Sequence, residues 1–206
     1  MNHHEYWEHY YRQHANPWTE PDEAVVQWAQ QRPHSEKTGK AIDLGAGEGG
    51  NSIWLAENGW QVTSVEMASS AIEVIERESE RRKLSIQTFA GDMRKLDLRA
   101  SFDFILLSYI HFSPADRKAL FHTWMPRLAA GGVWMYLGFW KDRDTLPEWA
   151  DPEEFPHASQ IASEMQMHEN MVVLEASDTR KCIPVDHDQR YFEGSITKVI
   201  VKKEGF

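Results

Sequence analysis

Apolar residues along this chain gather in short runs of strand length, separated by amphipathic or polar stretches that are long enough for helices. Alternation of such runs with helical segments is typical of an α/β fold with a doubly wound parallel sheet. The segments predicted as strands are 41–44, 61–66, a third strand that ends at the turn 89–93, and then 102–108, 133–137, 171–175 and 195–201.

Helix boundaries are marked by local capping signals. The sequence Ser-Ala-Ile-Glu at 70–73 has the spacing of a capping box, which predicts a helix from there to about Lys83. A second helix is predicted to start at Ser113-Pro114, because proline suits the first helical position, and to be closed by Gly131-Gly132. Residues 141–160 are rich in Pro, Asp and Glu, which predicts an irregular loop that can include a short helix and has the length of a functional lid.

The first 35 residues precede the first predicted strand and are rich in aromatic side chains. Tyr6, Trp7, Tyr10 and Tyr11 are crowded into one short stretch, and Trp18 follows between two prolines. An apolar helix is expected after this turn. These aromatics either cover a ligand or simply pack a helix against the sheet, since aromatic side chains dominate core burial in general.

Length and composition narrow the class of protein. A chain of 206 residues suits one α/β domain with a sizeable core, and we expect no second domain. No apolar run approaches the roughly 20 residues that cross a bilayer, and the first residues lack the pattern of a secretory signal, so a cytoplasmic location is expected. The formal net charge of -10 argues against a nucleic-acid ligand, because lysine and arginine supply most of that affinity. The single cysteine, Cys182, is interpreted as structural.

A glycine-rich turn carries the most specific chemistry. It follows the strand at 41–44, and a helix is predicted behind it, so glycines and free helix N–H groups would approach a bound ligand. Gly45, Gly47 and Gly50 match the dinucleotide fingerprint, in which pyrophosphate lies on the helix start. The acidic Asp43 before the turn favours a cationic ligand over a pyrophosphate, since its charge would oppose phosphates.

Read from Asp43 onward, this turn resembles the first motif of the class I S-adenosylmethionine-dependent methyltransferases. The resemblance spans about 40–140, and the stretch from Gly45 to Glu66 looks especially like the tellurite-resistance subgroup. It implies a Rossmann-like, mostly parallel seven-stranded sheet with an antiparallel edge strand. It also implies a single domain over 1–206, with a helical cover at 1–35, a cofactor-binding core at 40–140, and a lid loop with closing strands at 141–206.

The resemblance assigns roles to acids at the ends of the predicted strands. Glu66 would accept hydrogen bonds from the ribose hydroxyls, and Asp92 would bind the adenine amino group. Trp18 would cover the methionine end, and Ser108 would line the end where methyl transfer takes place. The cofactor-binding residues implied in this way are Trp18, Asp43, Gly45, Ala46, Gly47, Asn51, Glu66, Met67, Gly91, Asp92, Met93 and Ser108.

His111 is the candidate catalytic residue, because it follows the fourth predicted strand, where the methyl group and its acceptor should meet. An imidazole can take a proton near neutral pH. The alternative is that His111 only braces the start of the next helix. The histidines near the amino terminus lack the carboxylates or cysteines that complete a metal site, so no metal is expected.

The function expected from these residues is methyl transfer from S-adenosylmethionine to a small-molecule acceptor by in-line displacement, with S-adenosylhomocysteine as product. Two alternatives remain open at this point: a non-catalytic S-adenosylmethionine-binding regulatory module, and a NAD-dependent oxidoreductase. Neither nucleic acid nor a membrane is expected as a partner, and the protein is expected to be a monomer or a homodimer.

Overall fold

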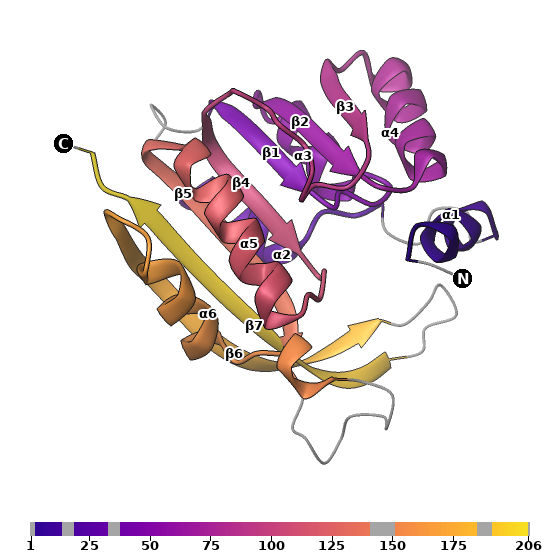
Figure 1. Cartoon of the computed structure of the whole chain (residues 1–206). Helices are drawn as coiled ribbons and strands as arrows, with labels where there is room; N and C mark the ends of the chain where they lie inside the picture. Colours follow the sequence, from indigo (N-terminus) through magenta and orange to yellow (C-terminus); the bar gives the residue numbers. More distant parts are fainter. Residues whose placement is uncertain (1–2, 14–18, 33–37, 141–150, 185–190, 206) are drawn as a thin grey trace. The chain divides into compact units, whose positions relative to one another are not determined.

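The computed structural model describes residues 3–13, 19–32, 38–140, 151–184 and 191–205. Seven strands form one mixed sheet in the order β3-β2-β1-β4-β5-β7-β6 (Figure 1). The chain divides into two compact units, 1–105 and 106–206, which are described separately below. The sheet order confirms the predicted Rossmann-like α/β fold with seven strands, while the single domain over 1–206 stays a prediction.

In the first unit, three neighbouring strands run parallel. They are β1 (Lys40–Leu44), β2 (Gln61–Glu66) and β3 (Ile86–Ala90). Every residue of β1 and β2 after the first is buried, as expected for strands that are covered on both faces, whereas β3 at the sheet edge is only partly buried. The apolar runs predicted from the sequence are therefore the inner strands of the sheet.

The helices of the first unit are α1 (His3–Gln13), α2 (Glu23–Gln31), α3 (Gly50–Glu57) and α4 (Ser69–Arg82). α3 packs against β1 and β2, and α4 packs against β3. α2 is held by stacking of Trp28 on Phe104, with ring centroids 4.0 Å apart. α1 lies beside α4, so part of the predicted amino-terminal cover is helical (Figure 1).

The start of α4 differs from the predicted capping box. The residue at the N-cap is Ala68, and no side chain of α4 caps the helix. The amide of Ser70 instead donates to the carboxylate of Glu8 on α1, with a distance of 3.3 Å. A carboxylate at a helix start is favourable because free N–H groups point there, so an acid from another helix replaces the local cap.

The second unit is built on a long antiparallel arrangement. β4 (Phe102–Ser108) crosses from the first unit into it, and β5 (Leu128–Trp140) pairs antiparallel with β7 (Tyr191–Lys203). β7 also pairs antiparallel with β6 (Met171–Pro184), which forms the sheet edge. These last two strands are much longer than the predicted runs, because ladder hydrogen bonds continue into polar sequence that carries no apolar signal.

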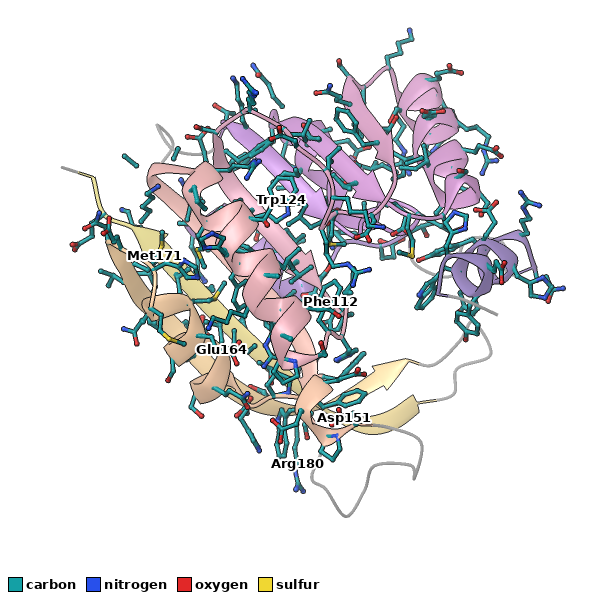
Figure 2. All side chains as sticks on the ribbon, in the orientation of Figure 1. Phe112, Trp124, Asp151, Glu164, Met171 and Arg180 are labelled. Atoms are coloured by element: carbon teal, nitrogen blue, oxygen red, sulfur yellow. The ribbon has the colours of Figure 1, made fainter. Side chains whose placement is uncertain are left out.

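α5 (Pro114–Trp124) starts as predicted, with the Ser113 side chain accepting the amide of Asp116. Its predicted end at Gly131-Gly132 is wrong, since a short 3₁₀ turn, η2 (Met125–Arg127), follows directly and both glycines lie in β5. Pro126 explains the early end, because proline has no N–H for a continued helix. Trp124, at the end of α5, is fully buried and is labelled in Figure 2.

The segment predicted as an irregular lid at 141–160 contains regular structure. Residues 141–150 lie outside the described ranges. A short 3₁₀ turn, η4 (Pro152–Glu154), is followed by α6 (Ala158–Gln166), which packs against β6 and β7. The short helix allowed for in this segment is α6, which begins at Ala158 and extends past residue 160 to Gln166. Among the helices of the described ranges, none is both long and apolar enough to cross a membrane.

The turn before α3 generates a prediction about stability. Gly49 has φ 86°, and a Cβ placed on it would lie 2.7 Å from Cγ1 of the buried Ile75. Gly131 has φ 76° but nothing within 4 Å, so it serves as a control for backbone strain alone. We expect Gly131→Ala to cost about 1–2 kcal/mol and Gly49→Ala to cost about 1–3 kcal/mol more through the clash. Urea unfolding of both variants measures this difference, and equal losses would contradict it.

Candidate functional site

The turn after β1, which starts at Gly45, is hydrogen-bonded to the end of β2. The amides of Gly45 and Ala46 donate to the carbonyl of Val65, at 2.7 and 3.0 Å. Gly45 and Gly47 have φ values of 77° and 54°, a region that glycine enters without strain. The glycine pattern is therefore needed to fold the turn back onto the end of β2.

Glu66 connects this turn with the ends of β2 and β3. Its Oε1 accepts the amides of Met67 and Ala68, at 2.7 and 3.0 Å, and its Oε2 accepts the amide of Gly47 at 3.0 Å. Its backbone carbonyl accepts the amide of Gly91 at 2.8 Å. Since a carboxylate offers about four lone-pair positions, roughly one position on Glu66 is left for a ligand hydroxyl.

Burial raises the pKa of the Glu66 carboxyl, while the three N–H donors act in the opposite direction. The side chain is only 6% exposed, so its negative charge is held in place chiefly by backbone dipoles. Such a carboxylate is oriented before any ligand arrives.

Asp43 is a second buried acid beside the same turn. Its Oδ2 accepts the hydroxyl of Ser52 at 2.8 Å, and Ser64 donates to Ser52 at 2.7 Å. Its Oδ1 is buried and has no hydrogen-bond partner among the described residues. Burial raises the pKa of Asp43 to about 7, and the charge of Glu66 adds to this shift. A buried acceptor of this kind suits a cationic donor such as an ammonium group.

Tyr11 of α1 covers the turn. Its hydroxyl lies 3.0 Å from the position that a Cβ on Gly47 would occupy, so a glycine is required beneath it. Burial, followed by the charges of Glu66 and Glu48, raises the pKa of Tyr11 above its usual range, which keeps the phenol protonated as a hydrogen-bond donor. Trp7 stacks on Tyr11 with ring centroids 5.8 Å apart. Trp18, the other predicted cover residue, lies outside the described residues.

A pocket of about 220 Å³ opens at the ends of β2 and β3. The carboxylate of Asp92 faces the guanidinium of Arg94 through two contacts of 2.9 Å, and this pairing lowers the pKa of Asp92. Met93 beside it is buried. The pocket is lined by Val65, Phe89, Ala90, Gly91, Asp92, Lys95 and Leu96.

Asn51, another residue predicted to bind the cofactor, makes a contact that joins two helices. Its Oδ1 accepts the amide of Asp22 at 2.8 Å, which fixes the start of α2 on α3. The first unit thus gathers Gly45 to Gly47, Glu66 with Met67, and Gly91 around the strand ends, with Asp43 buried beside them.

The second unit contains Ser108 and His111, which follow one another closely at the end of β4. Ser108 is the last residue of the strand and is partly exposed. The ring of His111 lies against Phe139 and Phe155, with centroid distances of 5.8 and 4.4 Å. Its Nδ1 is 3.0 Å from the carbonyl of Glu154. Because a carbonyl only accepts, Nδ1 carries the hydrogen, and in the neutral ring Nε2 then carries the lone pair.

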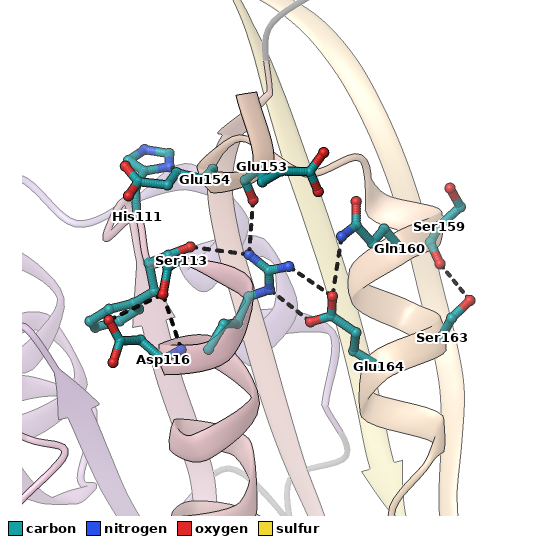
Figure 3. A network of polar contacts seen from close by, with 11 residues as sticks. His111, Ser113, Asp116, Glu153, Glu154, Ser159, Gln160, Ser163 and Glu164 are labelled. Atoms are coloured by element: carbon teal, nitrogen blue, oxygen red, sulfur yellow. Dashed lines mark hydrogen bonds and ion pairs between the residues drawn. The ribbon is translucent and has the colours of Figure 1, made fainter. Parts of the chain in front are cut away.

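A buried ion pair holds the loops around His111. Arg117 of α5 is 1% exposed and makes two bonds of 2.7 Å to Glu164 of α6 (Figure 3). The same guanidinium donates to the carbonyls of Phe112 and Glu153, both at 3.2 Å. These carbonyls belong to the two irregular segments that flank His111, so one cation joins both segments to the helices.

Several of these residues were not foreseen from the sequence. Ser52 lies within the glycine motif and could have been noticed as a hydroxyl on the first turn of the helix. Arg117 and Glu164 are 47 positions apart, so no local pattern connects them. Nothing in the local sequence marks Phe139 and Phe155 as neighbours of the His111 ring.

Residues 41–132 match a family model described as a methyltransferase domain. The chain is 40% identical over 57 residues to a ribosomal RNA small subunit methyltransferase C of Alcanivorax borkumensis, covering 28% of this chain and 18% of that protein. It is 31% identical over 71 residues to a probable S-adenosyl-L-methionine-dependent methyltransferase TehB of Haemophilus influenzae, covering 34% of this chain and 25% of that protein.

The matched stretches thus span about a fifth to a quarter of these curated relatives. Among solved structures, TehB from Haemophilus influenzae superimposes with a TM-score of 0.76 at 18% identity, covering 96% of this chain and 67% of that one. At this identity the likeness shows a shared fold.

The raised pKa of Asp43 predicts a pH-dependent stability. The folded chain holds a proton on Asp43 up to about pH 7, whereas the carboxyl has a value of 3.8 in the absence of the fold. The stabilisation is therefore fully present below about pH 4 and is lost as the pH rises to about 7, by about 1.4 kcal/mol for each unit. Asp43→Asn should lack this dependence, and urea unfolding of both proteins between pH 4 and 8 measures it. Parallel curves for the two proteins would contradict the shift.

The ion pair between Arg117 and Glu164 predicts a large loss of stability when one of its charges is removed. Glu164→Gln leaves the buried guanidinium without its counter-charge, which should cost about 3–5 kcal/mol. Glu78 pairs with Arg81, whose side chain is 62% exposed, so Glu78→Gln should cost less than about 1 kcal/mol. Denaturant titration of both variants tests the contrast, and a loss at Glu164 as small as that at Glu78 would refute the structural weight given to the pair.

Proposed function

We propose that this chain, of which residues 41–132 match a methyltransferase domain, is a class I S-adenosylmethionine-dependent methyltransferase that transfers a methyl group from S-adenosylmethionine to a small-molecule acceptor. The observation that carries this proposal is the position of Glu66, which joins the turns after β1, β2 and β3. Ligands of open α/β sheets bind outside the carboxyl ends of the strands, and these turns lie there.

Three features of the first unit fit the chemical groups of the cofactor. The buried Oδ1 of Asp43 suits the ammonium group, and the remaining lone-pair position of Glu66 suits a ribose hydroxyl. The pocket beside Asp92 and Met93 suits the adenine ring. We propose that the backbone around Gly45, Ala46, Gly47, Met67 and Gly91 completes this site, together with Asn51, Trp18 and Ser108.

When bound, S-adenosylmethionine supplies a methyl group on a positively charged sulfur, so no covalent enzyme intermediate is required. The work left to the chain is to align the acceptor and to exclude water, which can remove several kcal/mol of the barrier. His111 is the proposed proton acceptor. The carbonyl of Glu154 keeps its hydrogen on Nδ1, and Nε2 can then take the proton that the acceptor loses.

A small acceptor is favoured by the charge of the chain. The formal net charge of -10 opposes a polyanionic substrate. The buried acid Asp43 before the glycine turn disfavours the pyrophosphate of a nicotinamide cofactor, so an oxidoreductase is not proposed. The cytoplasmic location and the monomeric or homodimeric state stay predictions.

The proposal is tested by calorimetric titration with S-adenosylmethionine, S-adenosylhomocysteine and NADH. We expect both adenosyl compounds to bind. Glu66→Ala should weaken binding tenfold or more, because a hydrogen bond to a charged group contributes about 1.5–3 kcal/mol. The matched control is Glu73→Ala, an exposed acid on α4, which should leave the affinity unchanged.

Two outcomes would reject the proposal. Binding of NADH alone would point to the oxidoreductase, and equal affinities of wild type and Glu66→Ala would remove the site assignment. Release of S-adenosylhomocysteine with thiol, amine and hydroxyl acceptors then separates an enzyme from a non-catalytic binding module, which would bind the cofactor without turnover.

A further inference from the structure

Four partly exposed rings form an aromatic array in the second unit. The array consists of Tyr109, His111, Phe139 and Phe155. Tyr109 directly follows β4, and Phe139 is the last residue but one of β5. The carboxyl ends of two strands therefore carry aromatic faces at the position where open α/β sheets bind ligands.

The rings of the array are nearly parallel. Tyr109 and Phe139 are 4.8 Å apart with planes at 32°, and His111 makes angles of 19° with Phe139 and 31° with Phe155. The fully buried aromatics of the same unit pack differently, since Phe121 meets Trp134 at 88° and Tyr136 at 78°. Both geometries are favourable between aromatic rings, and a partly exposed ring presents a face on which a further flat ring can stack.

The backbone at Tyr109 is strained to make this arrangement. Tyr109 has φ 57°, a left-handed conformation that is unfavourable for a bulky residue. Its amide is tied to the carbonyl of Leu137 at 2.8 Å, which maintains the conformation. Strain of this kind concentrates at functional positions, so the fold maintains the placement of this ring against the preference of its backbone.

The array also has a rigid support. The ring of His111 is fixed by the carbonyl of Glu154, and Arg117 holds the neighbouring carbonyls of Phe112 and Glu153 (Figure 3). The charge of Arg117 is taken up by Glu164, so it is not available to bind an acidic acceptor. An aromatic cage for an ammonium group needs faces turned toward one point from several directions, which near-parallel rings do not provide.

We propose that the array is the acceptor subsite and that the acceptor is a flat aromatic or conjugated molecule bearing a hydroxyl, thiol or amino group. This inference rests on the proposed methyl transfer and narrows its substrate class. The flat ring stacks on the array, with its polar group on the side of His111.

The test measures binding of two shape-matched probes to the protein saturated with S-adenosylhomocysteine. The probes are 2-naphthol and its saturated analogue decahydro-2-naphthol, which carry the same hydroxyl on a flat and on a puckered frame. Ligand-observed NMR should show that the flat probe binds at least about tenfold more tightly. Each of Phe139→Leu and Phe155→Leu should reduce this preference about three- to tenfold, as expected for one aromatic contact.

Tyr6→Leu is the matched control, because Tyr6 is a 52% exposed aromatic on α1 outside the array, and its loss should leave the preference unchanged. Unaltered S-adenosylhomocysteine affinity in the Phe139 and Phe155 variants shows that they are folded. Equal binding of the two probes, or stronger binding of tetramethylammonium than of 2-naphthol, would overturn the aromatic acceptor alone. Failure of the wild type to bind S-adenosylhomocysteine would instead overturn the methyltransferase proposal itself.

Discussion

The arrangement of the first unit depends on the carboxylate of Glu66 and the three backbone amides that donate to it. A buried negative charge is costly unless it is hydrogen-bonded, and these donors come from Met67, Ala68 and the glycine turn at Gly47. The same residue binds Gly91 through its carbonyl. Through its carboxylate and its backbone carbonyl, Glu66 thus sets the mutual position of three loops that would otherwise have no ladder partners. These contacts are present before a ligand binds.

Burial of Asp43 and Glu66 lowers the stability of the protein without a ligand, because burial disfavours the charged form of each carboxyl group. Asp43 lies fully buried near Glu66, and its pKa is raised first by the loss of water and then by the charge of Glu66. Asp92 shows the opposite case, since Arg94 neutralises it and lowers its pKa. A cationic ligand would relieve the uncompensated acids, because opposite charges at short range stabilise the ionised form. The buried acids of the first unit therefore cost some stability in the absence of a positive group beside them.

In the second unit, the guanidinium of Arg117 holds segments that lie outside the sheet in place. Arg117 binds the carbonyls of Phe112 and Glu153 and is balanced by Glu164. Irregular segments have no neighbouring strand to satisfy their carbonyls, so a buried guanidinium with five donors can replace the missing ladder. The position of His111 follows from this support, whereas the positive φ of Tyr109 is maintained by its hydrogen bond to the carbonyl of Leu137. Both units thus use a buried charge to fix loops, with opposite signs.

The sequence by itself determined the α/β class, the inner strands and the glycine turn after β1. These follow from local features. Runs of apolar residues are buried in the folded chain, and glycine adopts the positive φ values of Gly45 and Gly47 without strain. The acids at strand ends were recognisable for the same reason, although their proposed ligand roles rest on the family.

Only the tertiary structure decided which partners these residues meet. The start of α4 is capped by Glu8 from 62 positions away, rather than by its own capping box. α5 ends at Trp124, and α6 lies in a segment whose composition indicated a loop. The partners Arg117 and Glu164, and the near-parallel rings around His111, come from distant elements. Such contacts depend on how helices and strands pack in space, and that packing leaves no periodic trace in the order of residues along the chain.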